Sequence, residues 1–233
     1  IQGKRGKTIL FDLISNMEAI GYVVHKQLIN AEDYGIPQRR KRIILVGERK
    51  DIGSEYTFPK PTGERQTVRE TIEFLPEPPE DGTSHPEYPL HRRDRLSDKN
   101  IKRLMALKQG QGRDHLPVEL LADCHTIDSA IIGHRNVYGR MSWDDVAPTI
   151  TARFDSFTRG MFGHPEQLRS ISLCEGALLQ TFPLDFVFSG SKVEVARQIG
   201  NAVPPKLGKI IGESIIEYYL RKEVKDFVLS GNH

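Results

Sequence analysis

The sequence has few cysteines and no long apolar run, and both absences narrow the class of protein. Its two thiols, Cys124 and Cys174, have no cysteine-rich motif around them, so neither a disulfide framework nor a zinc or other metal site is predicted. No stretch approaches the roughly 18 apolar residues of a membrane-spanning helix. The first residues, Ile-Gln-Gly-Lys-Arg, lack the apolar core of a signal peptide. We therefore expect a cytoplasmic protein with reduced thiols.

A large excess of either charge is also missing. Lys and Arg number 33 against 31 Asp and Glu, which gives a formal net charge of +2. This balance excludes a polybasic arm or an acidic tail, so affinity for a nucleic acid has to come from local clusters of basic residues. Hydrophobic residues make up 38% of the chain, with one Trp and ten Phe, which is enough for a packed core.

The first fifty residues have the pattern of an α/β protein. Apolar residues recur at helical spacing over residues 8–20, and Gly21 follows as a stop signal. Two stretches rich in β-forming residues come next, at 22–29 and 42–47, separated by a turn-prone loop. The second contains a continuous apolar run at 43–46, which is typical of a strand covered on both faces. This order predicts the end of an α/β sheet.

The composition changes after this region. Seven of the 14 prolines fall within residues 59–89. Because proline lacks a backbone donor, this distribution predicts an irregular subdomain and not a strand ladder. Capping signals and proline pairs predict further helices that start at Thr67, Ser97, Ser172 and Pro204-Pro205.

The densest basic cluster lies at residues 38–42, Gln-Arg-Arg-Lys-Arg, at the entrance of the second predicted strand. Neighbouring cations repel one another, so an anionic partner such as phosphate is the natural compensation. In strand geometry Gln38, Arg40 and Arg42 share one face, whereas Arg39 and Lys41 point to the other. A solvated strand end with scattered salt bridges is the alternative interpretation.

Residues 34–47, Tyr-Gly-Ile-Pro-Gln-Arg-Arg-Lys-Arg-Ile-Ile-Leu-Val-Gly, resemble the Gln-x-Arg-x-Arg motif of the DNA cytosine-5 methyltransferases. Three later blocks are similar to further motifs of that family, in the family's order. They are residues 138–152, residues 164–183, which end Leu-Gln-Thr-Phe-Pro, and Arg-Gln-Ile-Gly-Asn-Ala-Val-Pro-Pro at 197–205. Four blocks in this order are a specific match.

The resemblance implies an α/β fold in two parts. One is the C-terminal part of the Rossmann-like sheet of an S-adenosylmethionine-dependent methyltransferase, and the other is a small irregular α+β target recognition domain. It places the end of the catalytic domain at residues 1–50 and the recognition domain, with its supporting motif, at 51–190. Residues 191–233 form a C-terminal helix that returns to the catalytic domain.

The resemblance also implies site residues. Family members hold an extruded cytosine and a nearby phosphate with two arginines, which fall to Arg40 and Arg42 here, and Arg42 is the better candidate for the base. Gln38 is expected to orient these groups, and Arg39 to contact phosphate or solvent, both at the DNA interface. In the expected recognition domain, Arg92 and Arg93 belong to a basic patch that is predicted to contact phosphates or base edges. A solvated charged face is the alternative for that patch.

Asn201 and Ala202 lie in the Gly-Asn-Ala-Val turn with which the family contacts the methionine part of S-adenosylmethionine. We expect this turn to open the last helix. The unpaired amides of a helix start attract a carboxylate, such as that of the methionine part. A plain helix cap is the alternative interpretation. Cys124 and His125 are interpreted as structural. Residues interpreted as scaffold of the recognition domain are Arg140, Ser142, Thr149 and Thr151.

Three motifs that the family carries ahead of the arginine motif do not occur in this sequence. They are a phenylalanine-glycine turn for the cofactor, a proline-cysteine pair with the nucleophile, and a glutamate-asparagine-valine segment that protonates the base. Without a thiolate and an acid the covalent addition to cytosine cannot proceed, so the chain alone is predicted to be inactive. We expect it to work with an N-terminal methyltransferase half, either a separate subunit or an omitted segment.

The favoured hypothesis is therefore one part of a bacterial DNA cytosine-5 methyltransferase of restriction-modification. Its expected partners are double-stranded DNA, S-adenosylmethionine and the N-terminal half, and its expected location is the cytoplasm, at the nucleoid. The alternative is a DNA recognition fragment or specificity subunit without chemistry. RNA methylation is a third hypothesis, and the absence of a Cys-Phe-Thr tripeptide disfavours it.

Overall fold

The computed structural model describes residues 4–53, 55–122 and 137–230. The chain divides into two compact units. We call residues 1–30, 41–61 and 208–233 the hairpin unit, and residues 31–40 and 62–207 the loop-rich unit. No helix among the described residues is long and apolar enough to cross a membrane.

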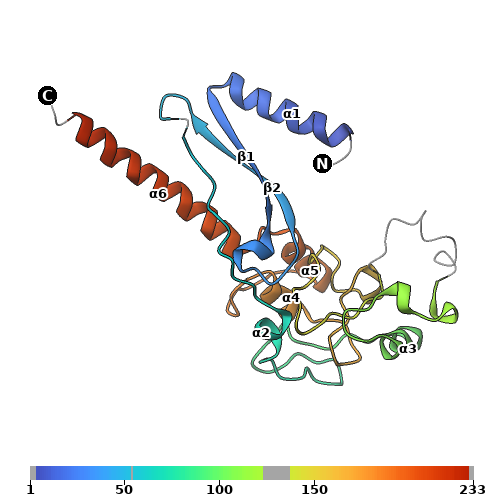
Figure 1. Ribbon diagram of the computed structural model, residues 1–233. Coiled ribbons are helices and arrows are strands. Elements are labelled where there is room, and N and C mark those ends of the chain that lie inside the picture. The colour runs from blue at the N-terminus through green and yellow to red at the C-terminus, as the bar shows by residue number, and fades with distance from the viewer. Residues whose placement is uncertain (1–3, 54, 123–136, 231–233) are drawn as a thin grey trace. The chain divides into compact units, whose positions relative to one another are not determined.

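The hairpin unit is built on two strands (Figure 1). Helix α1, Lys4–Ala19, ends at Gly21, whose φ of +94° is a left-handed conformation that glycine adopts without strain. Strands β1, Tyr22–Asn30, and β2, Lys41–Arg49, pair antiparallel, with Tyr22 opposite Arg49 and Asn30 opposite Lys41. The predicted helix and both predicted strands are confirmed. Most of the long helix α6, Pro205–Ser230, also belongs to this unit.

Much of the apolar surface of the hairpin unit is exposed. Helix α1 contacts β1, and the described sheet has two strands. The apolar run at 43–46 is half-buried and not covered on both faces. Beside it lies a hollow of about 740 Å³, lined by Phe11, Leu28 and Ile43 together with basic side chains. The large side chains left exposed on α1 and β1 are Ile9, Phe11, Leu13 and Leu28.

One carboxylate of the hairpin unit is buried at the end of β2. Glu48 is 3% exposed and accepts hydrogen bonds from the Tyr218 hydroxyl, the Tyr56 backbone amide at 3.2 Å and, at 3.0 Å, a ring nitrogen of His25. Burial alone would raise the pKa of Glu48, but these hydrogen bonds bring it below its ordinary value. The cluster therefore ties α6 to both strands within this unit.

The loop-rich unit contains short helices joined by irregular segments. Its α-helices are α2, Val68–Ile72; α3, Asp98–Ala106; α4, Leu173–Leu179; and α5, Lys192–Asn201. Short 3₁₀ turns lie before α2 at Ala31–Tyr34 and between α3 and α4 at Arg113–His115, Val118–Leu120 and Phe157–Arg159. The capping boxes predicted at Thr67 and Ser172 are confirmed. A core of buried apolar residues includes Trp143, Ile150, Phe154, Ile171, Leu179 and Ile199.

Helix α5 is not among the helices that the sequence predicts. Its start carries a third capping box, in which the Ser191 backbone amide donates to the Glu194 carboxylate at 2.8 Å. The last helix does begin at the proline pair, since α6 starts at Pro205. Gly200 and Asn201 consequently form the last turn of α5, and residues 202–204 are the connector to α6.

Candidate functional site

The arginine motif joins the block at residues 138–152 through its backbone. Gln38 forms a parallel β-bridge with Ala147. The Arg39 amide donates to the Ala147 carbonyl, and the Ala147 amide donates to the Pro37 carbonyl, each at 2.9 Å. The Thr149 hydroxyl donates to the Arg39 carbonyl at 2.5 Å, a backbone contact of the kind expected of a scaffold residue. Two blocks separated by about a hundred residues in the sequence are thus neighbours in the loop-rich unit.

Gln38 has no exposed surface, and both the oxygen and the nitrogen of its side-chain amide form hydrogen bonds. Its Oε1 accepts from the Ile150 amide at 3.1 Å, and its Nε2 donates to the Leu179 carbonyl at 3.0 Å and to Oε1 of Gln180. A fully buried side chain cannot touch a duplex in this conformation, so the expected DNA contact of Gln38 is corrected. Its contacts make Gln38 a residue that orients the arginine motif against the later blocks.

Arg40 is also buried, at 3% exposure. Its Nη1 donates to the Ile150 carbonyl at 2.8 Å, while Nη2 donates to the carbonyls of Gly200 at 2.9 Å and Ala202 at 3.0 Å. A guanidinium suits this work because its donors are fixed in direction and remain charged. The expected direct contact of Arg40 with cytosine or phosphate is corrected, since its donors are directed at backbone carbonyls of the site.

Gln180 is a site residue that the sequence reasoning missed. It caps the end of α4, is fully buried, and its Nε2 donates to the Ile199 carbonyl at 2.7 Å and the Ala202 carbonyl at 3.2 Å. Its Oε1 accepts from Gln38. The available signal was a lone amide residue following the apolar run Ala-Leu-Leu at the end of a predicted helix.

The Gly-Asn-Ala-Val turn at residues 200–203, which is predicted to contact the cofactor, does not open a helix as expected. Asn201 is the last residue of α5 and is exposed, and Ala202 caps the helix through its amide, which donates to the Gln198 carbonyl at 3.2 Å. The amide of Ala202 is therefore occupied and does not face a ligand. At Gly200, a Cβ atom would lie 2.2 Å from the backbone carbonyl of Thr151, so the two backbones are in direct contact there.

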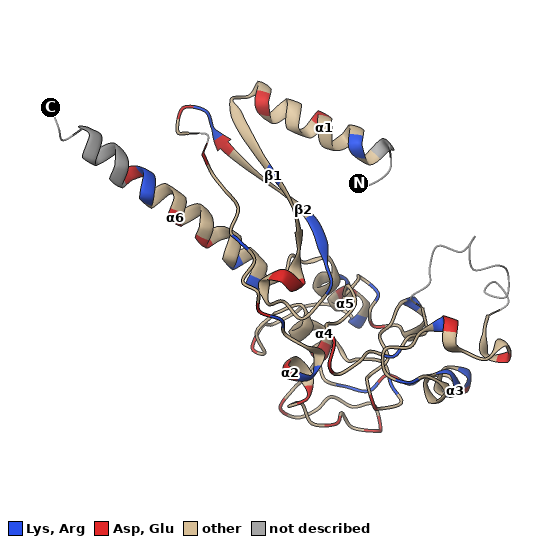
Figure 2. Cartoon of the chain, in the orientation of Figure 1, with Lys and Arg blue, Asp and Glu red and all other residues tan. Residues whose placement is uncertain are grey.

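Arg39 and Arg42 are exposed, in contrast to Arg40. Arg39 forms two hydrogen bonds of 2.6 Å from Nη2 to the Asp145 carboxylate, and Asp145 also holds Arg65. Hydrogen bonding by Asp145 raises the pKa of Arg39. Arg42 belongs to the hairpin unit and donates from Nη1 to the Lys41 carbonyl at 2.8 Å. The start of β2 is a basic segment of that unit (Figure 2).

The predicted patch around Arg92 is divided by the structure. His91 is buried, and its ring nitrogens lie 2.8 Å from the Ser172 hydroxyl and 2.7 Å from the Pro76 carbonyl. Arg93 is half-buried and forms ion pairs with Glu77 at 3.3 Å and Glu80 at 3.4 Å. Arg92 is exposed and lines a small hollow of about 150 Å³. Of the two predicted arginines, Arg92 is the more accessible to a phosphate.

A buried ion pair lies within the block at 164–183. The Arg169 guanidinium donates to both carboxylate oxygens of Glu175, at 2.7 and 2.6 Å, and both side chains are 1% exposed. Burial opposes ionisation, but Arg169 holds the pKa of Glu175 down to about 2. Burial also lowers the pKa of the nearby His164 to about 4, and Nδ1 of this ring accepts the Gln167 amide at 3.0 Å.

Arg140, in the block at 138–152, shows how a predicted scaffold arginine works. Arg140 is buried, and its guanidinium donates to the carbonyls of Leu107 at 3.1 Å, His164 at 2.8 Å and Leu104 at 2.8 Å. The carbonyls of an irregular chain need such donors, because no ladder or helix satisfies them. These contacts are of the kind expected of a scaffold residue, and the role in a recognition domain stays a prediction.

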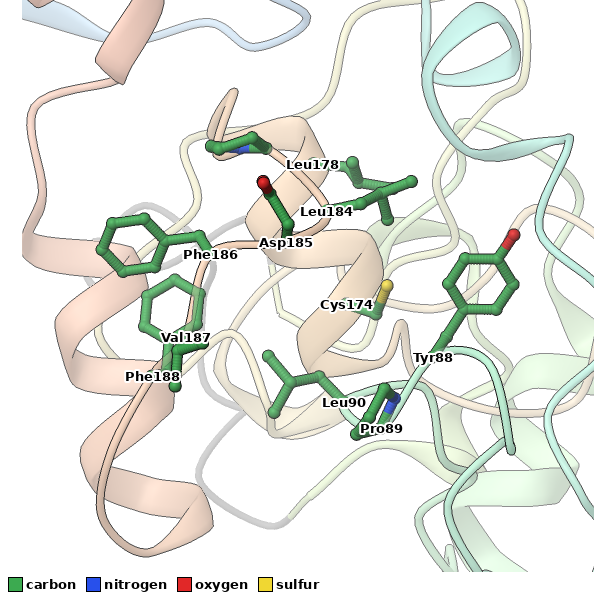
Figure 3. A pocket seen from close by; sticks show the side chains of 11 residues that line it. Tyr88, Pro89, Leu90, Cys174, Leu178, Leu184, Asp185, Phe186, Val187 and Phe188 are labelled. Atoms are coloured by element: carbon green, nitrogen blue, oxygen red, sulfur yellow. The ribbon is translucent and has the colours of Figure 1, made fainter.

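Cys174 does not have the surroundings of a nucleophile. It is 6% exposed on α4, beside an apolar hollow of about 340 Å³ that Leu90, Leu178 and Phe188 also line (Figure 3). Burial raises the pKa of its thiol to about 12, so the reactive thiolate is not populated near neutral pH. Cys124 and His125 lie outside the described residues.

Comparison with known proteins agrees with these motifs. The profile of the family described as C-5 cytosine-specific DNA methylase matches residues 1–217. The Type II methylase M.HgiDII of Herpetosiphon aurantiacus is 40% identical over 209 residues, which cover 88% of this chain and 58% of the relative. The Type II methyltransferase M.BbvI of Brevibacillus brevis is 35% identical over 224 residues, 95% of this chain and 56% of the relative. The chain spans rather more than half the length of these relatives.

A solved structure agrees at the level of the fold. A DNA modification methyltransferase encoded within a prophage of E. coli superposes with a TM-score of 0.63 at 20% identity, over 93% of this chain and 66% of that protein. The family profile covers most of the chain and includes all four motif blocks. By this match, the chain belongs to the C-5 cytosine-specific DNA methylase family.

Proposed function

We propose that this chain is the C-terminal part of a DNA cytosine-5 methyltransferase of restriction-modification, which methylates C5 of a flipped-out cytosine in duplex DNA. The observation that carries the proposal is the meeting of motif blocks around Gln38 and Arg40. These two side chains hydrogen-bond to Ile150, Gln180 and Ala202, which belong to three further blocks. The Type II methylase and methyltransferase relatives support the restriction-modification assignment.

Arg42 is the residue of this chain that we assign to the extruded cytosine. It is exposed, and the guanidinium has donors beyond the single bond to the Lys41 carbonyl. Arg39 and Arg92, both exposed, are assigned to DNA phosphates. Gln38 and Arg40 hold the site from inside and do not touch the base. Arg39 and Arg93 are each paired with two carboxylates, but the Arg93 side chain is only 22% exposed against 53% for Arg39, so Arg93 makes the smaller contribution to DNA binding.

S-adenosylmethionine is the proposed methyl donor. Asn201 would hold its methionine part, and Ala202, whose amide and carbonyl are both bonded within the protein, would contribute its methyl side chain. The residues fit this role because the Asn201 side chain is exposed, while the carbonyls around it already have protein donors. An amide side chain offers both a donor and an acceptor to an amino acid head group. When bound, the cofactor supplies a methyl group activated by a sulfonium. The part played by this chain is to orient that group against the base.

An N-terminal methyltransferase half is the proposed partner, and the hairpin unit supports it. Ile9, Phe11 and Leu28 are each more than 60% exposed, and a two-stranded sheet with such a face is marginal without further packing. The buried, protonated Cys174 supplies no nucleophile. We therefore expect the thiolate and the acid on the partner half, and no methyl transfer from this chain alone.

Methyl transfer from tritiated S-adenosylmethionine to duplex DNA tests the proposal. The chain is assayed alone and after addition of an N-terminal half with the proline-cysteine motif. Labelled DNA is expected only in the second case. Duplex binding by the chain with no labelling in either case would favour the recognition fragment, and labelling of tRNA but not DNA would favour the RNA hypothesis.

The Arg42→Ala variant tests the assignment of the base contact. We expect it to impair capture of an extruded base, read with a fluorescent base analogue, by about tenfold, because a good guanidinium contact contributes about 1–3 kcal/mol. Overall duplex binding should change less. The matched control is Arg221→Ala, an exposed arginine of the same unit that pairs with Glu217 on α6. Equal losses of capture and binding would reduce Arg42 to a phosphate contact.

A further inference from the structure

The connector between α5 and α6 is fixed on both sides by two consecutive residues at the end of α4. Gln180 donates from Nε2 to the Ile199 carbonyl at 2.7 Å and to the Ala202 carbonyl at 3.2 Å. The next residue, Thr181, accepts at its hydroxyl oxygen from the Lys206 amide at 3.0 Å. The Gln180 bonds hold the end of α5 and the first residue of the connector, and the Thr181 bond holds the start of α6 after it.

These bonds add partners to backbone groups at the ends of the two helices, where intrahelical partners are few; the Ile199 carbonyl also accepts the Ala202 amide at 3.3 Å. The last carbonyls of α5 need donors, and the side chain amide of Gln180 provides them together with Arg40. The first amides of α6 need acceptors. Pro205 has no amide hydrogen, so Lys206 carries the first one of the helix, and Thr181 caps it from a distant part of the sequence.

Thr181 has an unusual backbone conformation for its residue type, directly after the residue that caps α4. Its φ is +69°, in the left-handed region, which is unfavourable for a β-branched residue. Such strain persists only where the surrounding structure over-determines it. Here the Thr181 amide donates to the Leu178 carbonyl at 2.8 Å while its hydroxyl holds Lys206. The Phe182 amide donates to the Ala177 carbonyl at 2.9 Å in the same turn, so the backbone bonds that end α4 hold Thr181 in this conformation while its hydroxyl accepts from Lys206.

We propose that Gln180 and Thr181 are positioning residues that set the connector, and through it the affinity for the adenosyl cofactor. The inference rests on the proposed function, because the connector follows Asn201 and contains Ala202. Neither residue needs to touch the cofactor. Gln180 is fully buried, and it links the connector to Gln38 of the arginine motif. Gln180 thus links the connector, which we assign to the cofactor, to the arginine motif that precedes β2.

Four variants separate positioning from general stability. Gln180→Met keeps the volume but removes the donors, and Thr181→Val keeps the branched shape but removes the hydroxyl. Thr181→Ser restores the hydroxyl and is the conservative rescue. The matched control is Gln198→Met, which removes one bond of 2.7 Å from a glutamine of α5 to the Ser189 carbonyl, away from the connector.

The first measurement is amide hydrogen exchange of the chain itself. Exchange at Lys206 is expected to be about tenfold faster in Thr181→Val than in the parent, because one capping bond is typically worth about 1 kcal/mol or more. Thr181→Ser should exchange as the parent does. If Lys206 exchanges at the parental rate in Thr181→Val, the hydroxyl does not cap α6 and the proposal is overturned.

The second measurement is binding of S-adenosylhomocysteine to the chain assembled with the N-terminal half. Gln180→Met is expected to weaken binding about tenfold, since buried carbonyls lose their donors. The KM for S-adenosylmethionine should rise by a similar factor while kcat changes less than about twofold. Thr181→Val should show a smaller loss of the same kind. Gln198→Met should bind as the parent does.

The outcomes distinguish the two proposals. A parent assembly that binds no S-adenosylhomocysteine overturns the proposed function, and the cofactor part of this inference with it. A parent that binds normally, with folded Gln180→Met and Thr181→Val proteins that bind equally well, overturns the inference alone. A fall in kcat at constant KM would also contradict it, because that result indicates a smaller folded fraction and not a displaced connector.

Discussion

The two units of the chain differ in what they lack: the loop-rich unit has little regular secondary structure, and the hairpin unit has little cover for its apolar side chains. Many backbone carbonyls of the loop-rich unit are satisfied by buried side chains such as Gln38, Arg40 and Arg140. The hairpin unit satisfies its backbone by a strand ladder and long helices, but leaves large apolar side chains such as Phe11 and Leu28 exposed. One unit is organised around polar donors, and the other has apolar surface that remains to be covered.

This difference shows where each unit is sensitive to change. Removing a buried donor from the loop-rich unit leaves a carbonyl or carboxylate without a partner, which costs more than the bond itself contributes. Removing an exposed apolar side chain from the hairpin unit changes little in the isolated chain. Its effect should appear only when a second surface packs there. The predictions below test this contrast.

The largest effect is expected at the buried ion pair of the loop-rich unit. Arg169→Met leaves the Glu175 carboxylate buried without its guanidinium, and should destabilise the chain by about 3–5 kcal/mol in urea unfolding. The double variant Arg169→Met/Glu175→Leu should recover much of that loss, because no isolated charge remains. A double variant as unstable as the sum of the single ones would show that packing, and not charge, dominates.

A pH-dependent effect of about 3 kcal/mol is expected at His164. Its pKa is about 4 in the folded chain against 6.5 ordinarily, so the unfolded chain binds more protons between these values. Stability contributed by the neutral ring is present above about pH 6.5 and is lost as pH falls toward about 4. His164→Asn should flatten the unfolding free energy over that window. An unchanged slope in the variant would assign the pH dependence to other groups, such as His91, whose pKa burial also lowers.

The two arginines of the motif should respond differently. Arg40→Met removes three bonds to backbone carbonyls and should cost about 2–3 kcal/mol in thermal or urea unfolding. Arg42→Met, at an exposed position, should stay within about 0.5 kcal/mol of the parent. Similar losses at both positions would show that the contrast between the buried and exposed arginines is wrong.

The smallest effect on the chain itself is expected at the exposed face of α1. Phe11 is 70% exposed, so Phe11→Ser should change the unfolding free energy by less than about 0.5 kcal/mol. The same substitution should weaken association with the N-terminal half by about tenfold, measured by titration calorimetry, because an apolar side chain buried there contributes about 1.5–3 kcal/mol. Asp12→Ser, a polar exposed neighbour, is the control. Destabilisation of the chain alone would show that Phe11 already packs within it.

The fold could be predicted where local signals are strong. The apolar stripe ending at Gly21, the two strands, the capping boxes at Thr67 and Ser172, and the start of α6 at the proline pair all appear as expected. Helix α5 carried the same signal, Ser191 followed three residues later by Glu194, and was missed. That omission caused the cofactor turn to be placed at a helix start when it lies at a helix end.

The site could be predicted only in part, because strand alternation does not decide burial here: Gln38 and Arg40 are buried, whereas Arg42 on the same predicted face is exposed. The sequence identifies Gln38, Arg40 and Arg42 as one group of polar residues, but not which of them the later blocks bury. That depends on bonds to Ile150 and Ala202, more than a hundred residues away. Gln180 carried only a weak local signal, a lone amide after an apolar run, because its partners are backbone carbonyls and a side chain far away in the sequence.

The missing side chain at Gly200 has a mechanical consequence. A Cβ atom there would lie 2.2 Å from the carbonyl carbon of Thr151 and 2.4 Å from the Ala152 nitrogen, so main chain rests on main chain. A rotamer change can widen or narrow the gap between two side chains, but there is none here to rotate. The separation between these segments therefore behaves as a rigid spacer. Repacking of other side chains can change the angle between the two segments, but not the distance between their backbones at Gly200 and Thr151.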